Sequence, residues 1–160
     1  MKCIMILLAF FGVFNLHAQS EELRQQHFNL EDDNLAIQGY DPVSYLNNPK
    51  PLKGKKGLKF KYRGIIYQFA NSANLELFRA QPDKYEPVWG GWCGHAMAKR
   101  GEKVAINPTC FKIIDGRNVL FYKTIWANAL DNWNKELKTI PEDQLMKEGD
   151  TFWDGTIKSK

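Results

Sequence analysis

The side chains best suited to chemistry in this sequence are Cys93, His95, Met97 and Cys110. The first three alternate along the segment "EPVWGGWCGHAMAKRGEKVAINPTC" (86–110), and Cys110 ends it. Thiolate, imidazole and thioether groups suit copper, and cysteine and histidine also suit zinc. These residues predict a soft-metal site if the segment is extended or irregular, because alternate positions on a helix point in different directions. The alternative is that Met97 and Cys93 are buried as parts of the core.

The two cysteines allow two further roles. Cys93 at the start of a short helix would have a lowered pKa, and His95 could then activate it as a nucleophile. A disulfide between Cys93 and Cys110 would instead tie that helix to the next strand and stabilise the fold by about 3 kcal/mol. The spacing alone does not choose between bridged and free thiols.

A second candidate site is a small-molecule pocket lined by Tyr40, Asp41, Trp89 and Trp92. Aromatic rings combined with a carboxylate are typical of ligand pockets, although a dense aromatic cluster also suits a core. The sequence has no phosphate-binding glycine loop, no nucleophile elbow and no helical pair of histidines. We therefore expect a binding protein and not an enzyme.

Two β-hairpins and several short helices must position these side chains. Residues 58–69 alternate around a turn at Arg63-Gly64, and residues 111–122 do so around a turn at 115–118. Asp41 before Pro42 predicts a short capped helix. No strand–helix–strand repeat is present, so the sequence predicts a small α+β single domain of two antiparallel hairpins packed with short helices.

Three further helices follow from capping residues and apolar spacing. Asn71 or Ser72 would cap a helix that Pro82 ends. Residues 92–100 are predicted to form a second helix, which follows a turn at Gly90-Gly91 and is closed by Gly101. In a third helix, capped by Thr124, apolar residues recur at helical spacing: Ile125, Ala129, Leu130, Trp133 and Leu137.

The N-terminus indicates export. Lys2 precedes a short apolar run and Ala18, after which the chain turns polar, so residues 1–18 are predicted to be a signal peptide. Residues 19–34 would be a polar leader, 35–140 the domain and 141–160 a C-terminal tail. The exported chain, periplasmic or secreted, would have no membrane anchor after cleavage.

The charge of the 160-residue chain argues against a nucleic-acid partner. The formal net charge is only +4, and no nucleic-acid-binding motif accompanies the basic residues. The one basic run, at 50–61, alternates with glycine and apolar residues and indicates a solvated face.

Four blocks of sequence resemble the YHS-domain family, in its exported bacterial form. They are "GYDPVSYL" (39–46), "YQFANSANLELF" (67–78), "QPDKYEPVWGGWCGHAMA" (81–98) and "NPTCFKIIDGRNVLFY" (107–122). The resemblance covers about residues 35–137. It implies a small binding module without established enzymatic activity, and it implies heavy-metal binding, with copper as one proposed metal.

The chain departs from the metal-associated members of that family at three positions. Ser44, Ala70 and Asn74 stand where those members carry cysteines. Cys93 matches the cysteine of the exported form, whereas His95 and Cys110 depart from it. Any metal site, for copper or zinc, would therefore have to form around Cys93.

Overall fold

The computed structural model describes residues 21–158 and confirms the predicted α+β class. Its N-terminal half contains a four-stranded sheet of order β1-β2-β4-β3, in which β2 and β4 pair in parallel and the other pairs are antiparallel. The elements of this half are β1 (Leu30–Glu31), η1 (Asp32–Asn34), β2 (Leu35–Ala36), η2 (Ile37–Gly39), α2 (Ser44–Asn47), β3 (Lys59–Tyr62), β4 (Ile65–Gln68), α3 (Ser72–Ala80) and α4 (Pro82–Tyr85).

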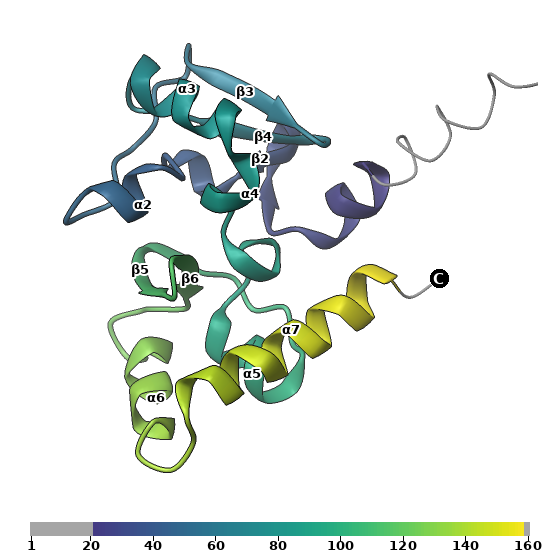
Figure 1. The fold of residues 1–160 in the computed structure, drawn as a ribbon, viewed down its shortest axis with the longest axis vertical. Coiled ribbons are helices and arrows are strands. Elements are labelled where there is room, and N and C mark those ends of the chain that lie inside the picture. Colours follow the sequence, from purple (N-terminus) through teal and green to yellow (C-terminus); the bar gives the residue numbers. More distant parts are fainter. Residues whose placement is uncertain (1–20, 159–160) are drawn as a thin grey trace, which may run out of the picture.

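The C-terminal half combines one hairpin with three helices and lies below the first half in Figure 1. Its elements are η3 (Val88–Gly91), α5 (Gly94–Arg100), β5 (Asn107–Ile114), β6 (Arg117–Phe121), α6 (Ala129–Glu136) and α7 (Glu142–Lys158). The turn η3 connects the two halves (Figure 1). One continuous set of buried side chains runs through both halves, so they share a core.

The first hairpin and the helix after it follow the sequence prediction. Arg63 and Gly64 form the turn with φ of 44° and 84°, the left-handed pair that a tight hairpin turn requires. Asn71 caps α3, because its side chain accepts a hydrogen bond of 2.8 Å from the backbone N–H of Asn74. Phe78 on this helix is fully buried against the rings of Tyr67 and Phe69 on and beyond β4.

The second hairpin has a tighter turn than the sequence indicates. Asp115 and Gly116 alone make the turn, with φ of 48° and 75°, and β5 begins at Asn107 instead of Phe111. The helix α5 agrees with the prediction at its end, where Gly101 adopts a φ of 63°. Gly94 at its start lets the helix approach the hairpin, since an added Cβ would lie 2.4 Å from the Val119 side chain.

The predicted helix from Thr124 begins too early. In the structure α6 starts at Ala129, and the side chain of Asn128 is the cap that accepts from the Leu130 N–H. Thr124 caps a separate turn instead, in which Ile125 is 88% exposed. The apolar spacing misled because Ile125 matches the helical period without belonging to the helix.

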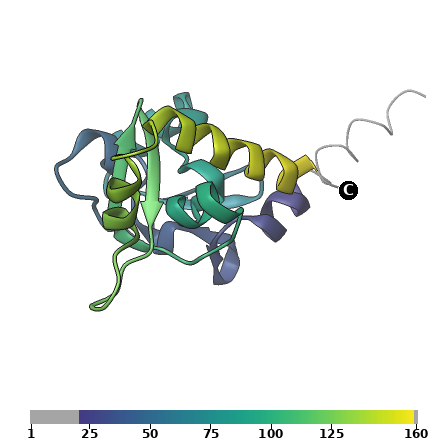
Figure 2. The ribbon, with the colours of Figure 1, turned by 90° about the horizontal axis from the view of Figure 1, so that it is seen from below.

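The predicted leader and tail are ordered over the described residues. Residues 21–27 are helical, and Phe28 packs into the core. The C-terminal segment forms the long helix α7, which packs against α5 and buries Leu145 and Met146. The far end of α7 lies beside the helix at 21–27 in both ribbon views (Figures 1 and 2). The predicted signal peptide lies outside the described residues, and among residues 21–158 no helix is long and apolar enough to cross a membrane.

Candidate functional site

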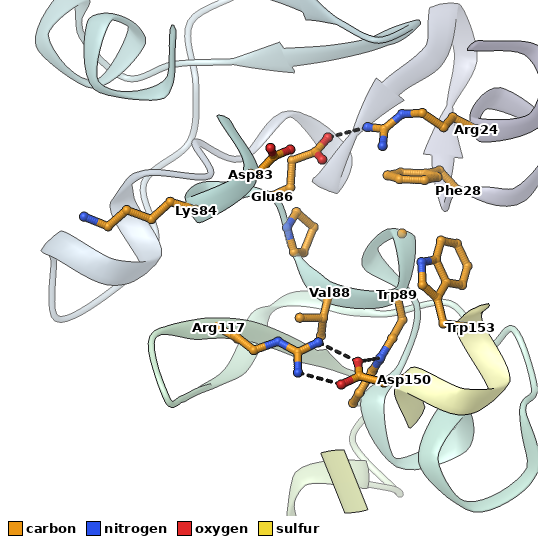
Figure 3. A pocket seen from close by; sticks show the side chains of 12 residues that line it. Arg24, Phe28, Asp83, Lys84, Glu86, Val88, Trp89, Arg117, Asp150 and Trp153 are labelled. Atoms are coloured by element: carbon orange, nitrogen blue, oxygen red, sulfur yellow. Dashed lines mark hydrogen bonds and ion pairs between the residues drawn. The ribbon is translucent and has the colours of Figure 1, made fainter. Parts of the chain in front are cut away.

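A cleft of about 270 Å³ lies where the two halves and the N-terminal helix meet (Figure 3). Its walls come from residues far apart in the sequence, which the fold brings to one place. The residues that line it are Arg24, Phe28, Asp83, Lys84, Glu86, Pro87, Val88, Trp89, Gly90, Arg117, Asp150 and Trp153.

The upper wall is built around the largely buried carboxylate of Glu86. Arg24 donates to Glu86 Oε1 at 2.5 Å, and the hydroxyl of Tyr67 donates to the same oxygen. Burial raises the pKa of Glu86, and the Arg24 charge together with the Tyr67 hydrogen bond opposes that rise. The Arg24 guanidinium also stacks 4.3 Å from the ring centre of Phe28, which fixes its position at the rim of the cleft.

The lower wall is built around Asp150 on α7. Arg117 holds this carboxylate with two hydrogen bonds, of 2.9 and 2.6 Å, and the indole N–H of Trp89 donates to Oδ1 at 2.9 Å (Figure 3). Burial opposes ionisation of Asp150, but the bonds from Arg117 and Trp89 outweigh it and lower the pKa of the carboxyl. Three separate elements, η3, β6 and α7, are joined through this one group.

Trp89 adopts an unusual backbone conformation at the centre of the cleft. Its φ is 53°, in the left-handed region that a bulky residue seldom occupies, and the residue is 2% exposed. Gly90 and Gly91 continue the left-handed turn that the sequence indicates, and an added Cβ on Gly90 would lie 2.6 Å from the Trp153 ring. Strained residues of this kind persist where the surrounding structure holds them, and they are frequent at functional sites.

The four residues predicted to bind metal lie in different surroundings. Cys93 is the N-cap residue of α5 and is 1% exposed, and Met97 one turn later is fully buried. His95 points to α6, where its Nε2 lies 3.6 Å from Glu136 Oε1, a separation longer than a hydrogen bond. Burial lowers the pKa of His95, and the Glu136 carboxylate opposes that shift.

Cys110 lies on β5 and is also buried as a free thiol, like Cys93. Its Sγ donates to Asn128 Oδ1 at 3.5 Å, and burial raises the pKa of the thiol. Cys93 is near enough to add to that rise electrostatically. Within residues 21–158 no group of three or more histidine, cysteine, aspartate or glutamate side chains could hold a metal ion.

The predicted pocket residues are dispersed in the same way. Trp89 lines the cleft, whereas Tyr40 lines a separate polar pocket near β5. Asp41 is completely buried, and its carboxylate accepts hydrogen bonds from the N–H groups of Val43 and Ala70 and from the Asn74 amide. Asp41 thus caps the turn before α2, three residues before that helix begins at Ser44, and ties this turn to the start of α3.

Trp92 joins the N-terminal segment to η3. Its indole N–H donates to the carbonyl of His27 at 2.7 Å. Of the four residues, only Trp89 reaches the cleft.

Comparison with known proteins finds no matching family model, no similar curated protein and no similar solved structure. The resemblance to YHS domains therefore depends on the sequence blocks alone.

Sequence reasoning missed most of the residues that form the cleft. Arg24 and Phe28 belong to the segment taken for a loose leader, and Asp150 belongs to the segment taken for a tail. The apolar pair Phe152-Trp153 late in the chain was a signal that the C-terminal segment packs against the core. Trp153 of this pair lines the cleft.

Proposed function

We propose that the protein is an exported YHS-type binding module, and that its ligand is a small organic molecule held in the cleft beside Trp89. The sequence blocks support the family, and the apolar N-terminal run supports export. The observation that carries the ligand proposal is the pairing of two arginine–carboxylate contacts on opposite walls, with aromatic rings between them (Figure 3).

The charges of the cleft favour a neutral or zwitterionic ligand. Three basic residues line it, and three acidic residues balance them: Arg24, Lys84 and Arg117 against Asp83, Glu86 and Asp150. A ligand carrying a net charge would meet no excess of the opposite charge, whereas a zwitterion could pair its two charges with an acidic and a basic side chain of the lining. The rings of Phe28 and Trp153, which pack edge to face with centres 5.6 Å apart, offer a surface for an apolar ligand group.

The same contacts support binding over catalysis. Glu86 and Asp150 are each held by an arginine and by a second donor, so both carboxylates are engaged. A general base needs access to the proton that it removes. The thiol of Cys93 is buried within the core, as expected for a structural cysteine.

The test uses three probes that share one phenyl group and differ in charge. L-phenylalanine is a zwitterion, phenethylamine a cation and 3-phenylpropionate an anion, and calorimetry measures the affinity of each. We expect L-phenylalanine to bind most tightly, in the millimolar range for a ligand of this size. Arg117→Gln should weaken its binding about tenfold through loss of a charge-assisted contact, whereas Arg79→Gln on the distant face of α3 should not.

Two results would overturn the proposal. One is that none of the three probes binds. The other is binding that Arg117→Gln and Trp153→Ala leave unchanged, since the ligand would then lie elsewhere.

A further inference from the structure

We propose that the loop of residues 122–127, the tip, docks on an anionic lipid bilayer. Ile125 and Trp126 would enter the interfacial layer, and Lys123 with Lys53 would contact lipid phosphates. This inference goes beyond the ligand cleft and does not depend on it.

The tip presents two large apolar side chains to solvent. Ile125 is 88% exposed and Trp126 90%, far above the exposure of the other large apolar residues of the described chain. All six residues from 122 to 127 are exposed. Figure 2 shows this loop, in green between β6 and α6, projecting beyond the rest of the molecule. Scattered exposed apolar residues are common, but an adjacent pair at a projecting point indicates a contact surface.

Hydrogen bonds at its base hold the tip in this shape. Thr124 Oγ1 accepts from the N–H groups of Trp126 and Ala127, and the Thr124 N–H donates to the Ala127 carbonyl at 2.8 Å. One step further in, the Ala129 N–H donates to the Tyr122 carbonyl at 2.9 Å. The exposure of the two apolar residues is thus built into an ordered turn, and binding would require little further ordering of the backbone.

The surface beside the tip is basic. Lys123 lines a polar pocket together with Lys53, whose ammonium lies 4.7 Å from the ring centre of Tyr40. No acidic side chain lines this pocket, and the tip contains none. The next acidic residue along the chain is Asp131, in the first turn of α6. Two lysines that border a hydrogen-bonding pocket match the phosphates of anionic lipids.

The combination of an exposed apolar pair with neighbouring lysines favours a bilayer over a protein partner. Tryptophan is enriched at the membrane interface, where its ring is apolar and its N–H remains hydrated. A stable protein interface buries about 800 Å² on each partner around an apolar centre, whereas the tip is a narrow projection next to a polar, lysine-bearing pocket. Interfacial binding combines insertion of apolar side chains with attraction between basic residues and anionic lipids, and the tip and its neighbouring lysines supply both.

The experiment measures sedimentation of the chain from residue 19 onward with vesicles of phosphatidylcholine, with and without phosphatidylglycerol. We expect binding to the vesicles that contain phosphatidylglycerol and weakening as salt is raised. Ile125→Ser with Trp126→Ser should abolish it, and these exposed positions should leave the unfolding midpoint unchanged. Lys123→Gln and Lys53→Gln should each reduce binding about fivefold, whereas Lys147→Gln, an exposed lysine on α7, should not.

Binding to neutral and anionic vesicles alike would overturn the role of the lysines, and binding retained by the double serine variant would overturn the role of the tip. Absence of vesicle binding at low salt would overturn the whole proposal. So would a self-association, measured by analytical ultracentrifugation without lipid, that the double serine variant removes, because the tip would then be a contact between copies.

Discussion

The indole nitrogen of Trp89 lies 2.9 Å from Oδ1 of Asp150, so the left-handed turn between the two halves is held by a carboxylate from the last helix. Arg117 binds the same carboxylate from the opposite side. The C-terminal helix is therefore part of the cleft, and disturbing it should affect both stability and binding.

Replacing Asp150 with Asn should lower the free energy of unfolding by about 1–2 kcal/mol, because the charge-assisted bonds to Arg117 are lost at a partly exposed site. Urea unfolding measures this change. Asp143→Asn, an exposed residue in the first turn of α7, is the control and should change stability by less than about 0.5 kcal/mol. Equal effects of the two variants would show that the contact contributes nothing.

The contact between Arg117 and Asp150 predicts that the stability of the protein depends on pH in the acid range. The pKa of Asp150 is lowered in the folded state, so its contribution to stability is present above the ordinary value of 3.8 and is lost as the pH falls through the lower folded value. The difference in stability between the natural protein and Asp150→Asn should therefore shrink below about pH 4. A difference that stays constant down to pH 2 would contradict this assignment.

Gly149→Ala should be strongly destabilising. A Cβ on Gly149 would lie 2.4 Å from the ring of Trp89, which is buried at 2% exposure. We expect a loss of about 1–3 kcal/mol in thermal or urea unfolding. The matched control is Gly155→Ala on the same helix, where nothing lies within 4 Å of the added Cβ, and where alanine should raise stability by about 0.5–1 kcal/mol. Similar effects at both positions would argue against close packing at Trp89.

Cys93 and Cys110 should be unreactive in the folded protein. Cys93 and Cys110 are buried, and burial raises the pKa of Cys110, so the thiolate that reacts is scarce. Thiol counting on the chain from residue 19 onward, which lacks Cys3, should find slow reaction in buffer and two titratable thiols in unfolded protein that has not been reduced. No titratable thiol in that unfolded sample would show a disulfide instead.

Metal binding that requires Cys93 and His95 together is not expected, since His95 faces Glu136 while Cys93 is enclosed at the base of α5. Metal-free protein would be offered Cu(I), Cu(II) and Zn(II), and bound metal measured after gel filtration. Stoichiometric metal binding that is lost in Cys93→Ser and also lost in His95→Ala would restore the soft-metal hypothesis.

His95 should make stability depend on pH near neutrality. Its pKa lies below the ordinary value of 6.5 in the folded state, so the unfolded chain takes up the proton first as the pH falls. The free energy of unfolding should decrease below about pH 6.5, and this decrease should be smaller in His95→Gln. The pKa of His27 is lowered too, and its contribution remains in both proteins. Identical pH profiles would rule out a contribution from His95.

Local signals in the sequence were sufficient for some elements and not for others. The turn at Arg63-Gly64 and the Asn71 cap act over a few residues, and both are confirmed. The predicted start of α6 was wrong because Thr124 and Asn128 are both good capping residues, and the spacing of the apolar residues did not distinguish between them.

The cleft was largely beyond reach from the sequence, because its contacts join residues far apart in the chain. Arg24 reaches Glu86, and Arg117 reaches Asp150, through tertiary packing that no local pattern encodes. Residues 21–27 and α7 are rich in charged residues, so their composition did not predict ordered helices. Both segments are stabilised by packing against the rest of the fold. Trp89 was identified because aromatic residues near glycines stand out by composition alone.

The helices on either side of residues 35–140 supply cleft residues that the four YHS-like sequence blocks do not contain. A fragment cut at residues 35 and 140 would retain Glu86, Trp89 and Arg117 and lose Arg24, Phe28, Asp150 and Trp153, leaving both walls of the cleft incomplete. The blocks that resemble YHS domains therefore supply a scaffold, while the flanking helices complete the lining of the cleft. Two chains with the same scaffold and different flanking helices would have clefts with different linings, so under the proposed function their ligands would differ while the core stayed unchanged.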